Sequence, residues 1–450
     1  LGGHLAGANH LAQQLAKDLE GKAIITNDSE NHGKLSLDSF GKSWGWIRTG
    51  ELSNWSDLMH KYSHGSKINF LQDSGSNLWK SSKSAEILIN KEKKEIDEES
   101  IDIIITPRNL NKCCWHPLTI WIGIGCEKET SFNLLIRAIT ESLERVNLAK
   151  ESIAGFATIN IKKNENCFLQ LSEKLNLPIQ FLNSTDLSRI SVPNPSKIVE
   201  SEVGSHSVSE ASAIIAAGPN VELIQEKKIF HSNDNEKGAV TIAISESRKQ
   251  FSPKTGELHL IGIGPGDISY MTADAKNALS RSVIWIGYSL YLDLVDSLRR
   301  NDQVRIDGKL TLEKERCLEA LDLASQGMRV ALISSGDVGI YGMASLALQV
   351  LLDKPEFARP KLFVHPGLSA MQLAAAKAGA PLGNDFCTIS LSDRLTPWKD
   401  IQKRIRIDPR ILSNMIPKST PQSHQNGTQN QTKKFYNFII EQNPFQDCPG

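Results

Sequence analysis

Short apolar runs alternate with stretches of helical periodicity along much of the chain, and this alternation sets the first expectation for the fold. Residues 119–126 form an apolar run that ends in glycines, which predicts a buried strand. Residues 131–149 carry apolar positions at helical spacing, which predicts an amphipathic helix. The alternation continues to residue 247. Residues 118–247 are therefore expected to form a compact α/β domain.

A second alternating block follows the polar segment 245–257, which contains proline and glycine and is expected to be a linker. Strands and helices are predicted there in turn, at residues 258–263, 272–280, 283–286, 312–325 and 329–333. Glycine-rich turns follow strands of this block. Because the carboxyl ends of parallel strands share one sheet edge, where open α/β folds bind ligands, a cleft is expected there. The fold class is α/β with several domains.

The two ends of the chain carry weaker patterns. Leucines at helical spacing in residues 1–19 predict a helix, and the apolar stretch 23–26 predicts a short buried strand. Residues 34–100 are largely polar, and no element is assigned to them before a buried strand predicted at 101–106. Residues 417–434 contain no aliphatic or aromatic side chain besides proline. Such a segment cannot bury a face, so it is expected to be disordered.

Composition narrows the range of partners. The 450 residues contain 51 Lys plus Arg and 51 Asp plus Glu, so a net charge of zero favours neither nucleic acid nor an acidic membrane surface as a partner. No apolar run approaches the ~20 residues that span a bilayer. Seven cysteines form an odd, sparse set, which is typical of the reducing cytoplasm. Cys113, Cys114 and His116 lack the two-residue gap of zinc ligands, so no metal is expected.

Three glycine-rich turns carry the candidate chemistry. The first, GIGPGD at 262–267, invites comparison with dinucleotide-binding loops. That assignment is disfavoured because Asp267 stands where the third glycine belongs, and its carboxylate would repel a pyrophosphate. The strand predicted at 283–286 also ends without the acidic residue that would hold a ribose. The other two turns are SSGDVGIYGMA at 334–344 and PGLSA at 366–370.

In this order and spacing, the three turns and the later stretch SLSDRLTPW resemble the tetrapyrrole methylases, in particular the precorrin-3B carbon-17 methyltransferases of cobalamin biosynthesis. This resemblance covers about residues 257–405. Four upstream stretches resemble the cobalamin-biosynthesis hydrolases that act on cobalt-precorrin-5A. They are GGHLAGAN at 2–9, WIGIGC at 121–126, IAGFATINIKKNE at 153–165 and VGSHSVSEASAIIAAG at 203–218. The chain is thus similar to a fusion of two enzymes of one pathway.

The resemblance implies an enzyme that uses S-adenosylmethionine to methylate carbon 17 of (cobalt-)precorrin-3B with ring contraction. The upstream half would open a cobalt-precorrin-5A lactone and release acetaldehyde. A tetrapyrrole is the implied partner, and a homodimer is the expected assembly. The implied regions are an incomplete hydrolase N-terminal domain with a variable middle at 1–106, its C-terminal α/β domain at 118–247, a methylase domain with an incomplete second lobe at 257–405, and a polar, disordered tail at 406–450.

Two alternatives to an active fusion stay open. The family's hydrolases extend before the first motif, and its methylases continue past residue 405 into further strands and helices. A truncated or frameshifted product with little methylase activity, or a scaffold with one competent domain, is therefore one alternative. A related methylase acting on another substrate, such as a protein or RNA side chain, is the other, because one fold hosts many functions.

For the methylase half, the resemblance assigns the second and third turns to the cofactor and the first to the tetrapyrrole. The implied cofactor-binding residues are Gly336, Asp337, Gly339, Ile340, Tyr341, Ser369 and Ala370. The implied tetrapyrrole-binding residues are Gly264, Pro265 and Gly266, with Asp267 as a catalytic candidate beside them. The competing interpretation makes Asp267 and Asp337 turn or N-cap residues and places Tyr341 in the core.

For the hydrolase half, opening a lactone requires an activated water or an assisting carboxyl group. His4, Glu165 and Glu210 are the catalytic candidates, with His206 as a further option. Glu210 also completes the pattern Ser-x-x-Glu from residue 207, so it is as readily a helix-capping residue. Cys126 is a candidate nucleophile, although a small buried thiol is the commoner role.

Overall fold

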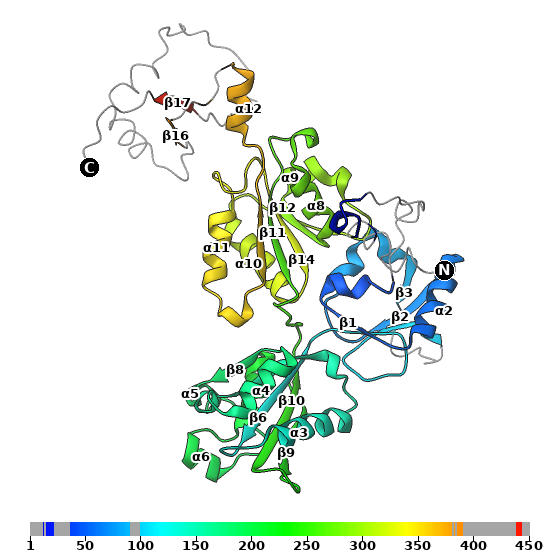
Figure 1. The fold of residues 1–450 in the computed structure, drawn as a ribbon, viewed down its shortest axis with the longest axis vertical. Coiled ribbons are helices and arrows are strands. Elements are labelled where there is room, and N and C mark those ends of the chain that lie inside the picture. The colour runs from blue at the N-terminus through cyan, green and yellow to red at the C-terminus, as the bar shows by residue number, and fades with distance from the viewer. Residues whose placement is uncertain are drawn as a thin grey trace, which may run out of the picture.

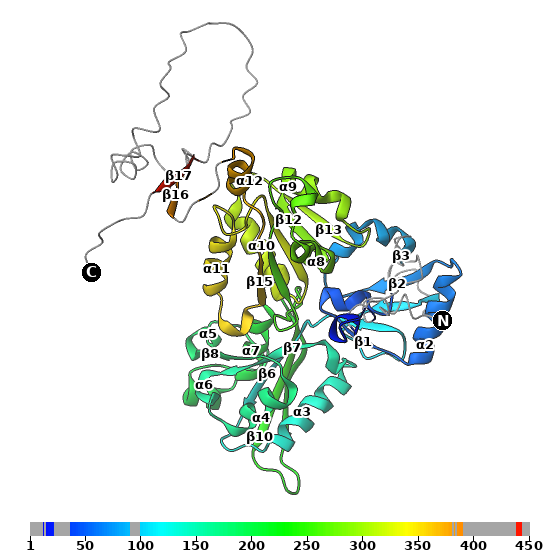
Figure 2. The same cartoon turned by 45° about the horizontal axis from the view of Figure 1, so that its top comes forward.

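The computed structural model describes residues 12, 15–21, 37–90, 100–379, 382, 385–389 and 438–442. Three modules, each built on a five-stranded sheet, follow one another along this part of the chain (Figure 1). The first module is blue to cyan in Figure 1, the second is cyan to green, and the third is green to orange. In both views the first module lies beside the junction of the other two (Figure 2). The predicted multi-domain α/β class is confirmed.

The first module has the strand order β1-β5-β4-β2-β3, with β1 antiparallel to β5 and the other pairs parallel. Its strands are β1 (Ile47–Thr49), β2 (Ile68–Gln72), β3 (Leu88–Asn90), β4 (Ile103–Ile105) and β5 (Cys114–His116). Its helices are α2 (Leu52–Ser63) and the 3-10 helices η2 (Phe40–Trp44), η3 (Leu78–Ser81) and η4 (Lys83–Ile87).

No helix or strand was predicted between residues 34 and 100, and this was wrong, because residues 40–90 form several of them. Trp44, Trp55 and Trp79 are almost fully buried there and pack in one apolar cluster. Each indole buries far more area than an aliphatic side chain, so a few of them build a core inside a polar sequence. A count of apolar residues therefore understates how well such a stretch can fold.

The second module has the strand order β8-β7-β6-β10-β9, in which β6, β7 and β8 are parallel and β10 runs antiparallel to both of its neighbours. Its strands are β6 (Ile120–Cys126), β7 (Ile153–Ile159), β8 (Ile179–Leu182), β9 (Leu223–His231) and β10 (Ala239–Glu246). Its helices are α3 (Phe132–Arg145), α4 (Asn166–Leu175), α5 (Ser184–Leu187), α6 (Lys197–Val203), α7 (Val208–Ala217), η7 (Lys150–Ser152) and η8 (Asn160–Lys162). The strand and helix predicted at 119–126 and 131–149 both form, and Ser131 caps the helix.

The third module is an all-parallel sheet with the strand order β13-β12-β14-β11-β15. Its strands are β11 (Glu257–Gly262), β12 (Ile284–Tyr288), β13 (Val304–Gly308), β14 (Arg329–Ser334) and β15 (Lys361–His365). Its helices are α8 (Ala273–Arg281), α9 (Ser289–Val295), α10 (Glu313–Ser325), α11 (Ala344–Leu352), α12 (Ala370–Lys377), η9 (Ile268–Tyr270), η10 (Asp296–Leu298) and η11 (Glu356–Ala358). All five elements predicted for this block form, within two residues of their expected ends.

The segment expected to be a linker is packed where the three modules meet. Gln250 is buried, and its amide oxygen accepts a hydrogen bond from the Trp46 indole nitrogen at 2.6 Å. Its amide nitrogen donates to the carbonyl oxygens of Trp44 and Gln326, the latter at 2.7 Å. A Cβ on Gly256 would lie 1.8 Å from the carbonyl oxygen of Ala324, so the segment lies directly on α10. These contacts fix the first and third modules against each other through the segment that follows the second module.

The two ends are described only in part. Residues 12 and 15–18 are helical, in line with the helix predicted for 1–19, while the strand predicted at 23–26 lies outside the described residues. The backbones of β16 (Asp385–Ile389) and β17 (Phe438–Gln442) pair antiparallel. The disorder expected for 406–450 therefore does not extend to β17. Within the described part of the chain, no helix has the length and apolar character needed to cross a membrane.

Candidate functional site

Three loops meet at the carboxyl edge of the third sheet. They follow β11, β14 and β15, which are neighbours in the sheet, so the parallel topology delivers them to one place. Gly264 and Gly336 join the first two loops by a pair of backbone hydrogen bonds, at 3.1 Å and 2.8 Å between nitrogen and oxygen. The predicted convergence of the three glycine-rich turns is thus present in the structure.

Glycines allow the loops to touch backbone to backbone. A Cβ on Gly262 would lie 2.6 Å from the carbonyl oxygen of Gly336, and one on Gly367 would lie 2.2 Å from the same oxygen. Any side chain at these two positions would force the loops apart. Gly336 differs, because its φ is +65° and a Cβ there would point into a space whose nearest atoms, in Ser369 and Ala370, are 3.8 Å away.

Asp337 ties the second loop to the third. Its Oδ1 accepts hydrogen bonds from the backbone nitrogens of Gly339 and Ile340, at 2.8 Å and 3.0 Å. Its Oδ2 accepts one from the nitrogen of Gly367 at 3.1 Å. The turn-residue interpretation of Asp337 therefore describes two of these three hydrogen bonds, and the third joins the neighbouring loop.

The remaining cofactor candidates occupy different positions around these loops. Ser369 is buried and caps α12 in a reciprocal pairing with Gln372, so that Ala370 begins the helix. Ile340 and Tyr341 are 42% and 55% exposed. The alternative that placed Tyr341 in the core is wrong, because its φ of +53° turns the chain outward at this point.

The first loop keeps an open face. Gly266 has a φ of +123°, and a Cβ there would meet nothing within 4 Å. Asp267 is exposed, and its Oδ1 accepts a hydrogen bond from the nitrogen of Ser269 at 2.8 Å, which caps η9. Hydrogen bonds from the Ser269 backbone and side chain lower the pKa of the Asp267 carboxyl. The N-cap interpretation of Asp267 is confirmed.

A buried pair of histidines supports the third loop and was missed from the sequence. The Nδ1 of His259 lies 2.9 Å from the Nε2 of His365, the last residue of β15. Outside this pair, His365 contacts Asp274 at 2.6 Å and His259 contacts Glu257 at 3.1 Å. The hydrogen bond with His259 lowers the pKa of Glu257. Histidines on neighbouring strands, each close to a glycine turn, were the available signal.

The hydrolase candidates do not form one cluster. His4 lies outside the described residues. Glu165 lies just beyond the carboxyl end of β7, where it accepts a hydrogen bond from the nitrogen of Glu129 at 3.0 Å and pairs with Lys162 at 3.2 Å. His206 instead lies 3.4 Å from Glu200.

Glu210 is fully buried in α7 and is engaged by its own domain. Its Oε1 accepts hydrogen bonds from the Asn194 side-chain nitrogen at 2.8 Å and the Lys227 backbone nitrogen at 3.0 Å. Its Oε2 accepts one from the Asn194 backbone nitrogen at 3.2 Å. The predicted capping box is wrong, because the Ser207 hydroxyl makes no cap bond and Glu210 faces away to β9.

The cysteine candidates have other partners. The thiol of Cys126 forms a hydrogen bond with Cys167, and this bond together with burial raises the pKa of Cys126. A thiol that keeps its proton is a poor nucleophile. His116 lies between the Thr49 hydroxyl and the Thr106 carbonyl oxygen, each at 2.7 Å, which occupies both ring nitrogens. Among the described residues, no three His, Cys, Asp or Glu side chains are grouped as metal ligands.

Comparison with known proteins gives two matches along the chain. Residues 257–410 match the family of Tetrapyrrole (Corrin/Porphyrin) Methylases, and residues 120–245 match the Cobalamin synthesis G C-terminus. The Precorrin-3B C(17)-methyltransferase of Sinorhizobium sp is 38% identical over 173 residues, covering 37% of this chain and 67% of that protein. The chain belongs to the tetrapyrrole methylases. The fusion of methylase and hydrolase-like parts predicted from the sequence is confirmed at the level of families.

Two further proteins are similar to the methylase part. The Cobalt-factor III methyltransferase of Priestia megaterium is 45% identical over 175 residues, covering 38% of this chain and 32% of that protein. The crystal structure of the methyltransferase CobJ is 38% identical, covers 34% of this chain and 62% of that chain, and gives a TM-score of 0.32. The chain thus spans 32% and 67% of the length of the two curated relatives.

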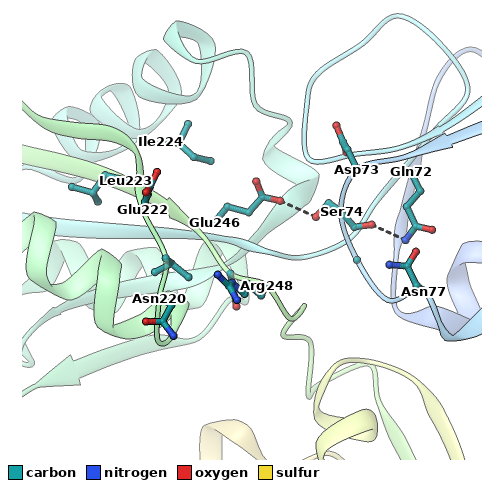
Figure 3. Close-up of a pocket in the computed structure, with 13 residues that line it drawn as sticks. Gln72, Asp73, Ser74, Asn77, Asn220, Glu222, Leu223, Ile224, Glu246 and Arg248 are labelled. Carbon is teal, nitrogen blue, oxygen red and sulfur yellow. Dashed lines mark hydrogen bonds between the residues drawn. The ribbon is translucent and has the colours of Figure 1, made fainter. Parts of the chain in front are cut away.

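This tetrapyrrole methylase has a crevice outside its three-loop site. A crevice of about 630 Å³ lies between the first and second modules and is lined by Gln72, Asp73, Ser74, Gly75, Asn77, Asn220, Val221, Glu222, Leu223, Ile224, Glu246, Ser247 and Arg248. Figure 3 shows Glu246 reaching from the second module toward Ser74 of the first. No local sequence pattern indicates this crevice, because its two walls lie more than a hundred residues apart in the chain.

Proposed function

We propose that the third module binds S-adenosylmethionine between its three loops and that the protein methylates carbon 17 of a precorrin-3B-type tetrapyrrole, with ring contraction. The observation that carries this proposal is the link made by Asp337, which holds its own turn and the nitrogen of Gly367 together. Gly336 leaves the space beside that link open. The names of the relatives from Sinorhizobium sp and Priestia megaterium support the substrate class.

The residues around the open space beside Gly336 fit S-adenosylmethionine. The Ser334 hydroxyl, at the end of β14, is buried and has no hydrogen-bond partner among the described residues, so the loop holds an unused polar group. A Cβ at Gly336 would occupy the hollow, and glycine keeps it open. S-adenosylmethionine supplies an electrophilic methyl group when bound. The protein's part is then to position the two reactants and exclude water, which requires no protein nucleophile.

In this proposal, the tetrapyrrole binds next to the first loop and to the exposed side chains of Ile340 and Tyr341. Gly264 pairs with Gly336, and a Cβ at Gly266 would meet nothing within 4 Å, so a flat ring can approach the turn closely at Gly266. Ile340 and Tyr341 offer exposed apolar surface on the adjoining turn. We assign them to packing on the bound reactants.

The hydrolase-like half is proposed to open the lactone of a cobalt-precorrin-5A-type substrate, with release of acetaldehyde. The match of residues 120–245 to the Cobalamin synthesis G C-terminus supports this role. Methyl transfer with ring contraction creates the lactone that this half would later consume. The packed junction at Gln250 holds the two halves together, which keeps each site at a high effective concentration relative to the other.

Calorimetric titration of the full chain with S-adenosylmethionine tests the methylase proposal. The unaltered chain is expected to bind, and Asp337→Ala is expected to bind at least ~10-fold more weakly, since three charge-assisted hydrogen bonds are lost. Glu319→Gln, on the exposed side of α10, is the matched control and should bind like the unaltered chain. Absence of binding heat from the unaltered chain would favour the inactive-product alternative.

A further inference from the structure

The crevice between the first two modules lies at the carboxyl edge of the first sheet. Strands β2 and β4 are parallel neighbours, and the residues directly after them are Asp73 and Thr106. Thr119 follows the next parallel strand, β5. Open α/β sheets bind ligands at this edge, and a volume of about 630 Å³ is in the range of small-molecule sites.

The second module supplies the opposite wall. Glu246 ends β10 and crosses to the first module, where the Ser74 hydroxyl donates a hydrogen bond to its Oε1 at 2.9 Å. The Thr119 hydroxyl is 3.5 Å from the same oxygen. Ser74 and Thr119 are buried, whereas Glu246 is half-buried beside the hollow. The carboxyl group is therefore held in place by Ser74 of the neighbouring module and by Thr119 at the start of its own, and it still borders the open space (Figure 3).

Three carboxyl groups, those of Asp73, Glu222 and Glu246, line this space, and Asp73 and Glu246 are the two held by hydroxyl groups. Asp73 is exposed, and the Thr106 hydroxyl donates to its Oδ2 at 3.1 Å. Burial raises the pKa of Glu246, and the negative charge of Asp73 adds to that rise, while the hydrogen bonds from Ser74 and Thr119 and the charge of Arg108 oppose it. A carboxyl group that burial keeps protonated can donate a proton, and an exposed carboxyl group beside the same space can accept one from a water.

We propose that this crevice is the lactone-opening site of the hydrolase-like half, with Glu246 as the proton donor and Asp73 as the base. The inference rests on the proposed hydrolase function. A water oxygen bonds to the lactone carbonyl carbon and gives its proton to Asp73. The ring carbon–oxygen bond breaks, and its oxygen takes the proton of Glu246. One water is consumed, the products are a carboxylic acid and a hydroxyl group, and solvent returns the proton from Asp73 to Glu246.

Arg248 offers a binding group for the carboxylates of a precorrin-type substrate. It is the positively charged side chain among the residues that line the crevice, and it is exposed. Precorrin-type tetrapyrroles carry several carboxylate side chains, which a guanidinium recognises through paired hydrogen bonds. Glu165 and Glu210 have no place in this site, because both are absent from its lining and have other partners.

The first test compares lactone opening by the full chain and its variants, followed by chromatography of the ring-opened product. Glu246→Gln keeps the shape and the acceptor for Ser74 but removes the proton, so kcat should fall by about 10²–10⁴-fold with little change in KM. Glu173→Gln, exposed on α4, is the control and should match the unaltered chain. If the chain opens the lactone and Glu246→Gln retains its rate, the crevice assignment is overturned while the hydrolase function stands.

A second test is independent of turnover. Dicyanocobyrinic acid, a stable corrin polycarboxylate, is titrated into the full chain and its dissociation constant is measured. Arg248→Ala should weaken binding at least ~10-fold, because a charge-assisted contact is lost. Arg189→Ala, whose side chain is 79% exposed outside the crevice, is the control. Equal affinities of Arg248→Ala and the unaltered chain, or no binding by either, would overturn the site even where no lactone is opened.

Discussion

The three-loop site and the crevice lie at the same kind of place, the carboxyl ends of parallel strands, but they are built from different groups. The three-loop site consists largely of backbone, and the carboxylate of Asp337 is taken up by three amide nitrogens. The crevice presents side chains, with Glu246 and Asp73 next to open space. Methyl transfer mainly requires that the two reactants are held in the right position. Ester hydrolysis also requires side chains that accept and donate protons. The groups that build each site therefore agree with the chemistry proposed for that half of the chain.

The largest effect that would separate the two sites is expected from Gly367→Ala. The added Cβ would lie 2.2 Å from the carbonyl oxygen of Gly336 and 2.6 Å from that of Gly262, and both atoms belong to backbone that is already paired. Overpacking of this kind should lower the free energy of unfolding by about 2–3 kcal/mol. Binding of S-adenosylmethionine should be lost, and lactone opening should persist.

Chemical denaturation and calorimetry measure these effects, with Gly65→Ala as the control. A Cβ at Gly65 meets nothing within 4 Å, so only the strain of its φ of +86° remains, which costs about 1 kcal/mol. Its cofactor binding should be unchanged. Equal losses of stability in the two variants would show that the three loops are not in the close contact described here.

The next contrast concerns pH. The pKa of Glu257 is lowered by its hydrogen bond with His259, so the stability that this group adds is present above the unfolded pKa of about 4.3 and is lost as the pH falls through the folded value. Burial raises the pKa of Glu246, so its contribution is full below about pH 4.3 and is lost as the pH rises through the folded value.

Glu257→Gln and Glu246→Gln should therefore change stability in opposite directions as the pH is raised from about 2 to about 7, the first mainly below about pH 4.3 and the second mainly above it. The first variant should fall progressively below the unaltered chain, and the second should gain on it, each by on the order of 1 kcal/mol. Urea unfolding at several pH values measures both differences. Parallel curves for the two variants would mean that the two carboxyl groups do not have contrasting environments.

Much of the three-loop site followed from sequence, because its signals are local. Each turn is a short run of glycines directly after an apolar strand, and the resemblance to the tetrapyrrole methylases suggested the roles that we propose for Asp337 and Ser369. The crevice could not be found that way. Ser74 and Glu246 are separated by 172 positions and meet only because two modules pack together. The capping role predicted for Glu210 failed for the same reason. Its carboxyl group binds Asn194, which lies outside the helix whose sequence suggested a cap.

The smallest effect is expected at Tyr341, and it distinguishes fold from function within the three-loop site. Its φ of +53° strains a residue that carries a Cβ, so Tyr341→Gly should raise the free energy of unfolding by about 0.5–1 kcal/mol. Thr311→Gly, at a φ of +75° on an exposed turn before α10, should gain a similar amount.

Cofactor affinity then separates these two glycine variants. Tyr341→Gly removes a ring that is 55% exposed beside the hollow, so S-adenosylmethionine should bind about 3–10-fold more weakly, the value of a lost partial apolar contact. Thr311→Gly should bind like the unaltered chain. Backbone strain of this kind is common at ligand sites, so a loss of affinity in Tyr341→Gly alone would place its side chain against the bound cofactor. Unchanged affinity in both variants would remove Tyr341 from the site and leave Asp337 as the residue on which the methylase proposal depends.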